Sequence, residues 1–303
     1  MTDGTRPHET TGDGQGRAAV YVALVAQSMM ASGTHVVARV IAQEVDPFTL
    51  TLVRSLLAAV VMGALLLAGV VRLSIRREDY LLVAALSFLA IPVNQFLFLM
   101  GMRYTLASNA ALLYSTTPLF VLIFSRWFLR ESLNTRKIVG VALGLIGVTV
   151  VVFEHGISSS IEYLLGDVIV FLAVLAWALY TVFGKPVIHR YGPVQATTMT
   201  LLIGTLMFLP IGIIPAATFP YDSLTPVNWG EIFYLGLITS VGSYFLWYYA
   251  LARIEAGKAA LFTNLQPILT SVLAVIFLGQ PISAGFIIGG LIALAGVVTA
   301  QFG

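Results

Sequence analysis

Cysteine is absent from this 303-residue sequence. Its absence excludes disulfide bonds, cysteine-ligated zinc and a thiol nucleophile. Charge is scarce as well: charged residues make up 10% of the chain, whereas soluble domains contain about 25%. Water is therefore not the solvent around most of this chain's surface.

Long apolar runs make up most of what is present. Hydrophobic residues account for 58% of the chain, and a helix that crosses a bilayer needs about 20 mostly apolar residues. The runs predict an all-α polytopic membrane protein with ten transmembrane helices. The predicted spans are 18–41, 48–71, 79–101, 106–129, 136–153, 165–186, 193–214, 229–252, 258–278 and 283–302.

The first 17 residues differ from the rest, because they are polar and rich in Gly, Thr and Asp. No apolar run with a cleavage site precedes the first span. We therefore expect residues 1–17 to form a disordered cytoplasmic tail and not a signal peptide.

The sequence contains an internal repeat, which is the feature to look for first in a chain of this kind. Segment 107–148 matches segment 256–297 without a gap, with 11 identities over 42 positions. Apolar composition alone matches a few leucines and valines, but these identities include Pro118 with Pro267 and two pairs of glycines. The chain is predicted to be two copies of one unit.

The distribution of Lys and Arg predicts the orientation, because cytoplasmic loops carry the excess of these residues. With a cytoplasmic N-terminus, 13 of them lie on the inside and Arg103 alone lies outside. This predicts N-in/C-in topology. The repeats 18–153 and 160–303 then hold five helices each and enter the membrane from opposite sides. Inverted repeats are typical of secondary transporters, whose substrate site lies near the midplane.

Several motifs carry a resemblance to a known family. They are Pro47 followed by Arg54, the ASNAALLYSTTPLF segment with Glu131 and Arg136 after it, the WALYTVFGK run ending at Lys185, residues 256–267, and the glycine-rich fifth and tenth spans. Together they resemble the drug/metabolite transporter superfamily, specifically its ten-helix EamA type with two tandem repeats. The resemblance covers about residues 18–302.

Among the branches of that superfamily, the chain is most similar to the YddG-type exporters of aromatic and other amino acids. The resemblance implies a small-molecule substrate and a multi-pass location in the bacterial inner membrane. We expect no cofactor, metal or nucleic acid, and a monomer is compatible with the sequence. The chain departs from the family at Ser32 to His35, where an aromatic-glycine pair is usual, and at Gln280, where a glutamate is usual. The family's residues at those positions are not carried over.

Polar side chains inside spans are costly unless they face a cavity or a partner. The first span carries Gln27, Ser28, Ala31, Ser32 and His35 at steps of three and four residues, which places them on one side. His35 is the only histidine in the interior of a predicted span. It either bonds to a neighbouring helix or acts as a substrate contact or proton acceptor.

The third span carries Asn94 and Gln95 beside Pro92. Because proline frees a backbone carbonyl, these amides either satisfy that carbonyl or face the pore.

The fourth and ninth spans both carry polar residues around a proline. These are Asn109, Tyr114, Ser115, Thr116, Thr117 and Pro118 in one, and Thr263, Asn264, Gln266 and Pro267 in the other. Equivalent interrupted helices in two repeats point to a central site. Alternatively, they are kinked packing helices whose Ser and Thr bond their own backbones.

Aromatic residues recur at helical spacing in the sixth and eighth spans. They are Trp177 and Tyr180 with Thr181, and Tyr244, Trp247 and Tyr248 with Ser240. Such stripes are often packing or interfacial belts. If they line the pathway, they suit a flat apolar side chain or a cation.

We predict that the substrate-binding residues are His35, Asn94, Gln95, Tyr114, Trp177, Tyr180, Tyr244, Trp247 and Asn264. Gating or structural roles fall to Arg54, Pro118 and Pro267. Arg54 is expected to pair with a polar group across helices or to hold a gate. Arg39 and Lys185 are expected at the cytoplasmic ends of their spans, where their heads reach the lipid headgroups.

Acidic residues are missing from the depths of the spans, where Asp167 and Glu231 reach furthest. Proton-driven antiporters usually need a deep carboxylate with a shifted pKa. This absence favours facilitated transport, with His35 as the only candidate proton site.

The function predicted from the sequence is export of amino acids, aromatic or bulky apolar ones, by alternating access around a central cavity. The alternative is a multidrug or other small-metabolite exporter with proton coupling through His35. A membrane enzyme is disfavoured, because no Ser-His-Asp set, HExxH motif or carboxylate pair lies within the spans. A receptor or scaffold has no obvious use for an inverted repeat.

Overall fold

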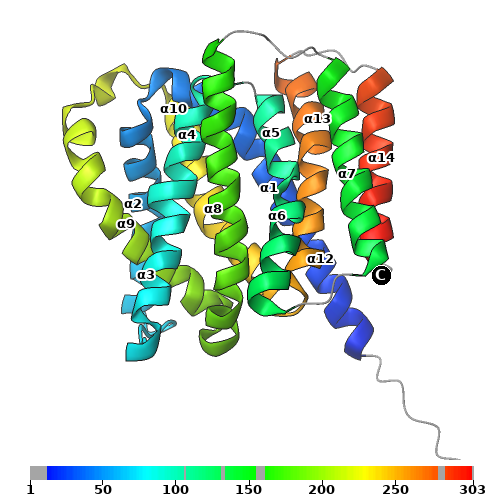
Figure 1. Cartoon of the computed structure of the whole chain (residues 1–303). Helices are drawn as coiled ribbons and strands as arrows, with labels where there is room; N and C mark the ends of the chain where they lie inside the picture. The colour runs from blue at the N-terminus through cyan, green and yellow to red at the C-terminus, as the bar shows by residue number, and fades with distance from the viewer. Residues whose placement is uncertain (1–11, 106, 131–133, 155–160, 279–283, 302–303) are drawn as a thin grey trace, which may run out of the picture.

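The structure, a computed structural model, describes residues 12–105, 107–130, 134–154, 161–278 and 284–301. All secondary structure in these ranges is helical. Figure 1 shows the helices standing side by side as one upright bundle, with α9 at one edge and α7 and α14 at the other.

The first half of the chain contains two single helices, two interrupted runs and a further helix. The single helices at the start are α1 (Gly12–Glu44) and α2 (Pro47–Leu67). The first run consists of η1 (Arg77–Asp79), α3 (Tyr80–Phe88), the π-helix η2 (Leu89–Gln95) and α4 (Phe96–Met102). The second run consists of α5 (Ala107–Ser115), α6 (Thr117–Phe124) and the π-helix η3 (Ser125–Leu129), and the further helix is α7 (Thr135–Glu154).

The second half follows the same order. It begins with α8 (Ile161–Tyr191), α9 (Pro193–Thr218) and η4 (Tyr221–Ser223). One run then consists of α10 (Pro226–Phe233), the π-helix η5 (Tyr234–Ser243) and α11 (Tyr244–Leu251). The next run consists of α12 (Ala256–Ala260), the 3-10 helix η6 (Leu261–Leu265) and α13 (Gln266–Leu278), and α14 (Ala284–Gln301) follows it.

Seven helical stretches are long and apolar enough to cross a membrane. They are Ala18–Glu44, Pro47–Leu67, Arg77–Met102, Ala110–Leu129, Leu165–Tyr191, Pro193–Thr218 and Ala256–Phe277. Each overlaps a predicted span. The helical runs of α7, α10 to α11 and α14 are not among the seven found in the described residues, so the count of ten stays a prediction.

The N-terminal boundary differs from the expectation. Helix α1 begins at Gly12, six residues before the first predicted span. Residues 1–11, Glu131 and Gln280 lie outside the described residues.

Three helices begin at signals that the sequence contains. The Asp46 carboxylate accepts hydrogen bonds from the backbone N–H groups of Phe48 and Thr49, at 3.1 and 3.0 Å, and Pro47 is the first residue of α2. A carboxylate at this position satisfies N–H groups that have no partner within the helix, and proline has no N–H to lose there. Helices α9 and α10 likewise begin with a proline.

The helical breaks fall at equivalent places in the two halves. Helices α6 and α13 begin at Thr117 and Gln266, 149 residues apart, each with a proline as the second residue. The third helical run of each half contains a π-helix, η2 and η5. In η2 it surrounds Pro92, where the wider turn accommodates a ring that clashes with a regular helix. The repeat in the sequence therefore extends to local backbone irregularities.

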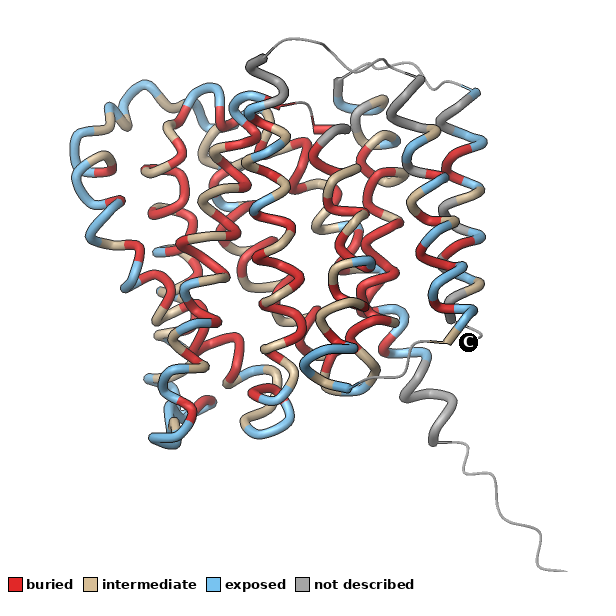
Figure 2. The backbone as a smooth tube through the Cα atoms, in the orientation of Figure 1, coloured by how far each residue is buried: buried red, intermediate tan, exposed pale blue. Residues whose placement is uncertain are grey.

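Helix packing is reciprocal between the halves. Helix α2 packs on α9, and α7 packs on α14. Helix α1 contacts α11 and α13, while the equivalent α8 contacts α4 and α6. Figure 2 shows buried positions where helices face one another and exposed positions on the outer sides of the bundle. The outer surface is apolar, as with Val60, Leu81, Ile214 and Leu291, each more than half exposed.

Arg39 corrects one expectation. Its Nη1 donates to the carbonyl oxygens of Met102 and Arg103, at 2.9 and 3.1 Å. These carbonyls terminate α4, where a cation is favourable. Arg39 therefore lies at the same end of the bundle as Arg103, the one basic residue expected outside, because α1 and the α3–α4 run end on the same side. A cytoplasmic end for Arg39 and an outside position for Arg103 therefore do not both hold.

Candidate functional site

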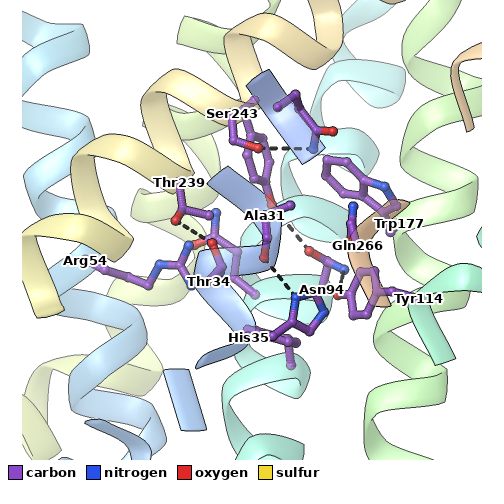
Figure 3. Close-up of a pocket in the computed structure, with 14 residues that line it drawn as sticks. Ala31, Thr34, His35, Arg54, Asn94, Tyr114, Trp177, Thr239, Ser243 and Gln266 are labelled. Carbon is purple, nitrogen blue, oxygen red and sulfur yellow. Dashed lines mark hydrogen bonds between the residues drawn. The ribbon is translucent and has the colours of Figure 1, made fainter. Parts of the chain in front are cut away.

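A cavity of about 60 Å³ lies between helices of both halves (Figure 3). It is lined by Gln27, Ala31, Thr34, His35, Arg54, Asn94, Gln95, Phe98, Tyr114, Trp177, Thr239, Ser243, Tyr244 and Gln266. Pockets that hold whole ligands measure about 300–1,000 Å³. A substrate larger than a few water molecules therefore requires the lining helices to move apart.

Helix α1 contributes four of these residues, and two of them form hydrogen bonds to η5. Gln27 Nε2 donates to Ser243 Oγ at 3.2 Å, and the Oγ1 atoms of Thr34 and Thr239 are 2.7 Å apart. Gln27 Oε1 is buried without a hydrogen-bond partner. One acceptor on this face is therefore available to a ligand.

His35 has a defined tautomer in its neutral form. Its Nδ1 lies 2.8 Å from the carbonyl oxygen of Ala31, and a carbonyl only accepts, so Nδ1 carries the proton. Nε2 is then an acceptor, and it is buried without a partner. The rings of Phe98 and Tyr114 meet the imidazole edge-on, each with centroids 5.4 Å away. His35 thus presents one lone pair to an aromatic-lined cavity.

Asn94, in η2, connects several walls of the cavity. Its Nδ2 donates to Tyr114 Oη at 2.9 Å and to the Ala173 carbonyl at 2.8 Å. Its Oδ1 accepts from Tyr244 Oη at 3.3 Å. Because these bonds use both amide N–H groups, Asn94 positions two phenol rings and is not free to donate to a substrate.

Trp177 forms the aromatic wall. Its ring stacks on Tyr180 with centroids 5.4 Å apart and meets Tyr244 edge-on at 5.2 Å. Trp247 lies behind it at 5.5 Å and donates from Nε1 to Thr181 Oγ1 at 3.2 Å. Trp177 and Tyr244 therefore line the cavity, while Tyr180 and Trp247 support them from behind.

Arg54 enters the cavity from α2. Its Nε and Nη2 donate to Ser240 Oγ at 3.3 and 2.9 Å, and the Ser240 hydroxyl donates to the Leu235 carbonyl at 2.9 Å. The guanidinium is 1% exposed. Among the described residues, no Asp or Glu forms an ion pair with it. Arg54 therefore does bond to a polar group across helices.

Six of the nine predicted binding residues meet at the cavity. They are His35, Asn94, Gln95, Tyr114, Trp177 and Tyr244. Tyr180, Trp247 and Asn264 are buried but do not line it. Asn264 lies against Gly144 of α7, since a Cβ atom at that glycine would collide with its side-chain amide. Asn264 fits against α7 because Gly144 has no side chain. Residue spacing alone does not predict that Asn264 faces α7 and not the cavity.

Residues that were not assigned to the site also line it, including Thr34, Phe98, Thr239 and Ser243. A regular helix through the eighth span predicted that Ser240 shares a face with Tyr244. The π-helix η5 widens the turns from Tyr234 to Ser243, so Thr239 and Ser243 reach the cavity while Ser240 bonds to Arg54. For Phe98, the signal was present, because it lies four residues after Asn94 on the same helical face.

The hydroxyls around the two prolines mostly bond to their own helices. Ser115 and Thr116 donate to the carbonyls of Leu112 and Leu113, and Thr263 donates to that of Ala260. These bonds satisfy carbonyls at the helical breaks. The packing interpretation holds for these hydroxyls, while Tyr114 and Gln266 of the same helical runs line the cavity.

The cavity is chemically uneven although the fold repeats. A shift of 146 residues pairs Ala31 of α1 with Trp177 of α8, and Thr34 with Tyr180. One wall is therefore small and polar, and the facing wall is aromatic. In the described residues, no group of three or more His, Asp or Glu side chains gathers to hold a metal ion.

An apolar bundle with a buried cavity of polar and aromatic residues between its halves is the architecture of a multi-pass membrane transporter. Comparison with known families identifies which one. The chain belongs to the EamA-like transporter family, whose profile matches residues 18–153 and 164–300.

Relatives of known sequence are also transporters. The chain is 27% identical over 282 residues to "Uncharacterized transporter YetK" of Bacillus subtilis, covering 91% of this chain and 85% of that protein. It is 29% identical over 269 residues to an "Uncharacterized transporter" of Archaeoglobus fulgidus, covering 88% and 91%. A "Probable terminal-alkyne amino-acid exporter" of Streptantibioticus cattleyicolor is 26% identical over 223 residues, covering 74% and 73%.

A solved crystal structure has the same fold. It matches with a TM-score of 0.74 at 20% sequence identity, covering 95% of this chain and 98% of that one. The family and the relatives are transporters and not enzymes. This chain is accordingly a membrane transporter, which implies a small-molecule substrate and contact with lipid.

Proposed function

We propose that this protein exports amino acids with aromatic or bulky apolar side chains across the bacterial inner membrane. The observation that carries the proposal is the cavity between the halves, which combines flat aromatic surfaces with unpartnered polar atoms. An amino acid needs both, because its side chain is buried on the former while its charged groups require hydrogen bonds. The naming of one relative as a probable amino-acid exporter agrees with this proposal.

The transport mechanism in this proposal is alternating access by ten helices arranged as two inverted repeats. The helical runs of α7, α10 to α11 and α14 would add three spans to the seven found. The reciprocal packing of the halves supports the repeat. One pair of hydrogen bonds supports it as well. Asn94 donates to the carbonyl of residue 173 in α8, and Ser243 accepts from the amide of residue 27 in α1. A shift of 149 relates residue 94 to residue 243, and a shift of 146 relates residue 27 to residue 173.

Transport in this proposal is facilitative. None of the acidic residues that the structure describes lines the cavity. A deep carboxylate is the usual proton carrier in antiporters. Without it, the concentration gradient of the amino acid drives export.

Flux into proteoliposomes tests this function. The purified full-length protein is reconstituted, and uptake of labelled phenylalanine, tryptophan, leucine and glycine is measured with and without an imposed pH gradient. We expect saturable equilibration of phenylalanine and tryptophan that the pH gradient does not drive uphill. Protein-free liposomes provide the baseline. Equal flux of glycine and tryptophan, or no amino acid flux at all, contradicts the proposal.

A second candidate is a metabolite or multidrug exporter coupled to protons through His35. The observation that favours it is the unpartnered Nε2 of His35 at the cavity. The His35→Ala variant separates the two. If a pH gradient drives accumulation in the wild-type protein and His35→Ala abolishes it, His35 is the proton site. If His35→Ala alters affinity without creating or removing a pH effect, His35 is a binding residue only.

A further inference from the structure

We infer that Arg54 binds the carboxylate of the transported molecule, so that the cavity selects organic carboxylates. The inference rests on the proposed function, because it names the group that holds the amino acid. It differs from the gating or structural role that the sequence suggested for this residue.

The charge of Arg54 has no counter-charge in the described part of the protein. A guanidinium stays protonated in proteins. Buried charges are normally paired, because removing an ion from water without a partner is strongly unfavourable, and in membrane proteins such residues mark substrate pathways. Arg54 is 1% exposed, and its hydrogen bonds to described residues end on the neutral Ser240 hydroxyl. A substrate carboxylate would supply the missing charge.

The guanidinium is held with donors to spare. Ser240 uses its own proton on the Leu235 carbonyl, so its oxygen is oriented to accept from Arg54. Gly236 allows α2 to approach this closely, because a Cβ atom there would lie 3.1 Å from the Arg54 carbonyl oxygen. Of the five guanidinium N–H groups, the two bonds to Ser240 leave two on Nη1 and one on Nη2, and one N–H from each of these nitrogens points in the same direction. Two parallel N–H groups fit a carboxylate with two hydrogen bonds.

The rest of the cavity complements a zwitterion. Gln27 Oε1, Gln266 Oε1 and His35 Nε2 are buried acceptors without partners. They suit an ammonium group, which only donates. Figure 3 shows Arg54 and Gln266 entering the cavity from opposite sides. One cationic donor and three separate acceptors match the two ends of an α-amino acid.

Binding of four matched probes to the protein in lipid nanodiscs tests the inference. The probes share a phenyl ring: phenylalanine, phenylalaninamide without the carboxylate, 3-phenylpropionate without the ammonium, and phenethylamine. Dissociation constants are measured by titration calorimetry for the wild-type protein and for Arg54→Gln, whose amide nitrogen can take the place of Arg54 Nε and still bond Ser240. We expect Arg54→Gln to weaken phenylalanine about ten- to hundredfold, the range for a hydrogen bond to a charged group. Its effect on phenylalaninamide should stay below about threefold.

Two further variants control for charge and for folding. Arg54→Lys keeps the charge and loses the planar fork, so phenylalanine binding weakens while the preference over phenylalaninamide persists. This variant also provides the comparison if Arg54→Gln does not fold. Arg39→Gln removes an arginine that caps α4 outside the cavity, and it should bind all four probes as the wild type does.

The outcomes separate this inference from the proposed function. If Arg54→Gln keeps the wild-type preference for phenylalanine over phenylalaninamide, or if no carboxylate probe binds the wild type, the inference is wrong. If 3-phenylpropionate binds through Arg54 but amino acids are not transported, the carboxylate site stands and amino acid export does not. If phenylalanine is transported and Arg54→Gln leaves its affinity unchanged, export stands and the carboxylate site does not.

Discussion

The cavity and the α7–α14 pair are built on opposite principles. Around the cavity, polar atoms of Gln27, His35 and Gln266 are buried without partners, although such atoms destabilise a fold. The pair instead relies on close backbone contact, since a Cβ atom at Gly296 would lie 2.6 Å from the Gly140 carbonyl oxygen and the Gly144 nitrogen. The comparison indicates that the pair is stabilised by close packing, while the cavity keeps binding groups available at the expense of stability.

The pair also lies apart from the cavity. None of its described residues lines the cavity, and Figure 1 shows α7 and α14 together at one edge of the bundle. Its outer surface is apolar, with Ile138, Ile146, Ile288 and Leu291 exposed. If the two regions have separate roles, substitutions in the pair should change stability without selectivity, and substitutions at the cavity should change selectivity.

The largest expected effect is that of Gly296→Ala. Small residues let membrane helices approach closely, and overpacking typically costs about 1–3 kcal/mol, so the unfolding midpoint in detergent should fall by several degrees. The flux ratio of phenylalanine to leucine should not change. Gly63→Ala is the matched control, because a Cβ atom at Gly63 of α2 meets no atom within 4 Å. A changed flux ratio in Gly296→Ala would contradict the separation of the two regions.

Trp177→Leu, a substitution at the cavity, should instead change selectivity. Leucine stays apolar but removes the flat face, and aromatic contacts contribute about 0.5–1.5 kcal/mol beyond buried area. Phenylalanine flux should therefore fall up to about tenfold, while leucine flux changes little. The exposed Trp127 serves as control, since Trp127→Leu alters a ring that is 69% exposed. Equal losses for phenylalanine and leucine would show that Trp177 only supports the fold.

Sequence reasoning predicted much of the architecture of this protein. The repeat, visible in one proline and two glycines per copy, anticipated the matching starts of α6 and α13. The scarcity of charge made Asn94, Gln95 and His35 stand out as intramembrane polar residues, and all three line the cavity.

The remainder of the site depended on geometry that periodicity does not carry. The π-helix η5 turned Thr239 and Ser243 toward the cavity, and nothing in YLGLITSVGS indicates where a helix widens. Asn264 shares the polar character of its neighbours, but the close approach of α7 at Gly144 accommodates it away from the cavity. Such faces are set by helix packing, which a single sequence does not specify.

The smallest expected effect concerns an ion pair that connects α7 to the rest of the bundle. Lys137, in the first turn of α7, contacts the Glu255 carboxylate just before α12. Partial burial raises the pKa of Glu255, but the Lys137 hydrogen bond and the charges of Lys137, Lys258 and Lys185 outweigh it, so the pKa lies below its usual value. A carboxyl group with a lowered pKa stabilises the fold at pH values above its unfolded pKa, and this stabilisation is lost as the pH falls through the folded pKa.

Glu255→Gln should therefore lower stability at pH 7 and lose its effect in acid. The loss at pH 7 should be about 1 kcal/mol or less, because Glu255 is partly exposed and water screens the pair. Below the lowered pKa of Glu255 in the folded protein, both proteins carry a neutral group at this position, so their unfolding midpoints should converge there. Asp222→Asn, at an exposed aspartate of η4, controls for a general change of charge. If the Glu255→Gln difference persists at low pH, the carboxylate acts through its shape and not its charge, and α7 is then held to the bundle by packing alone.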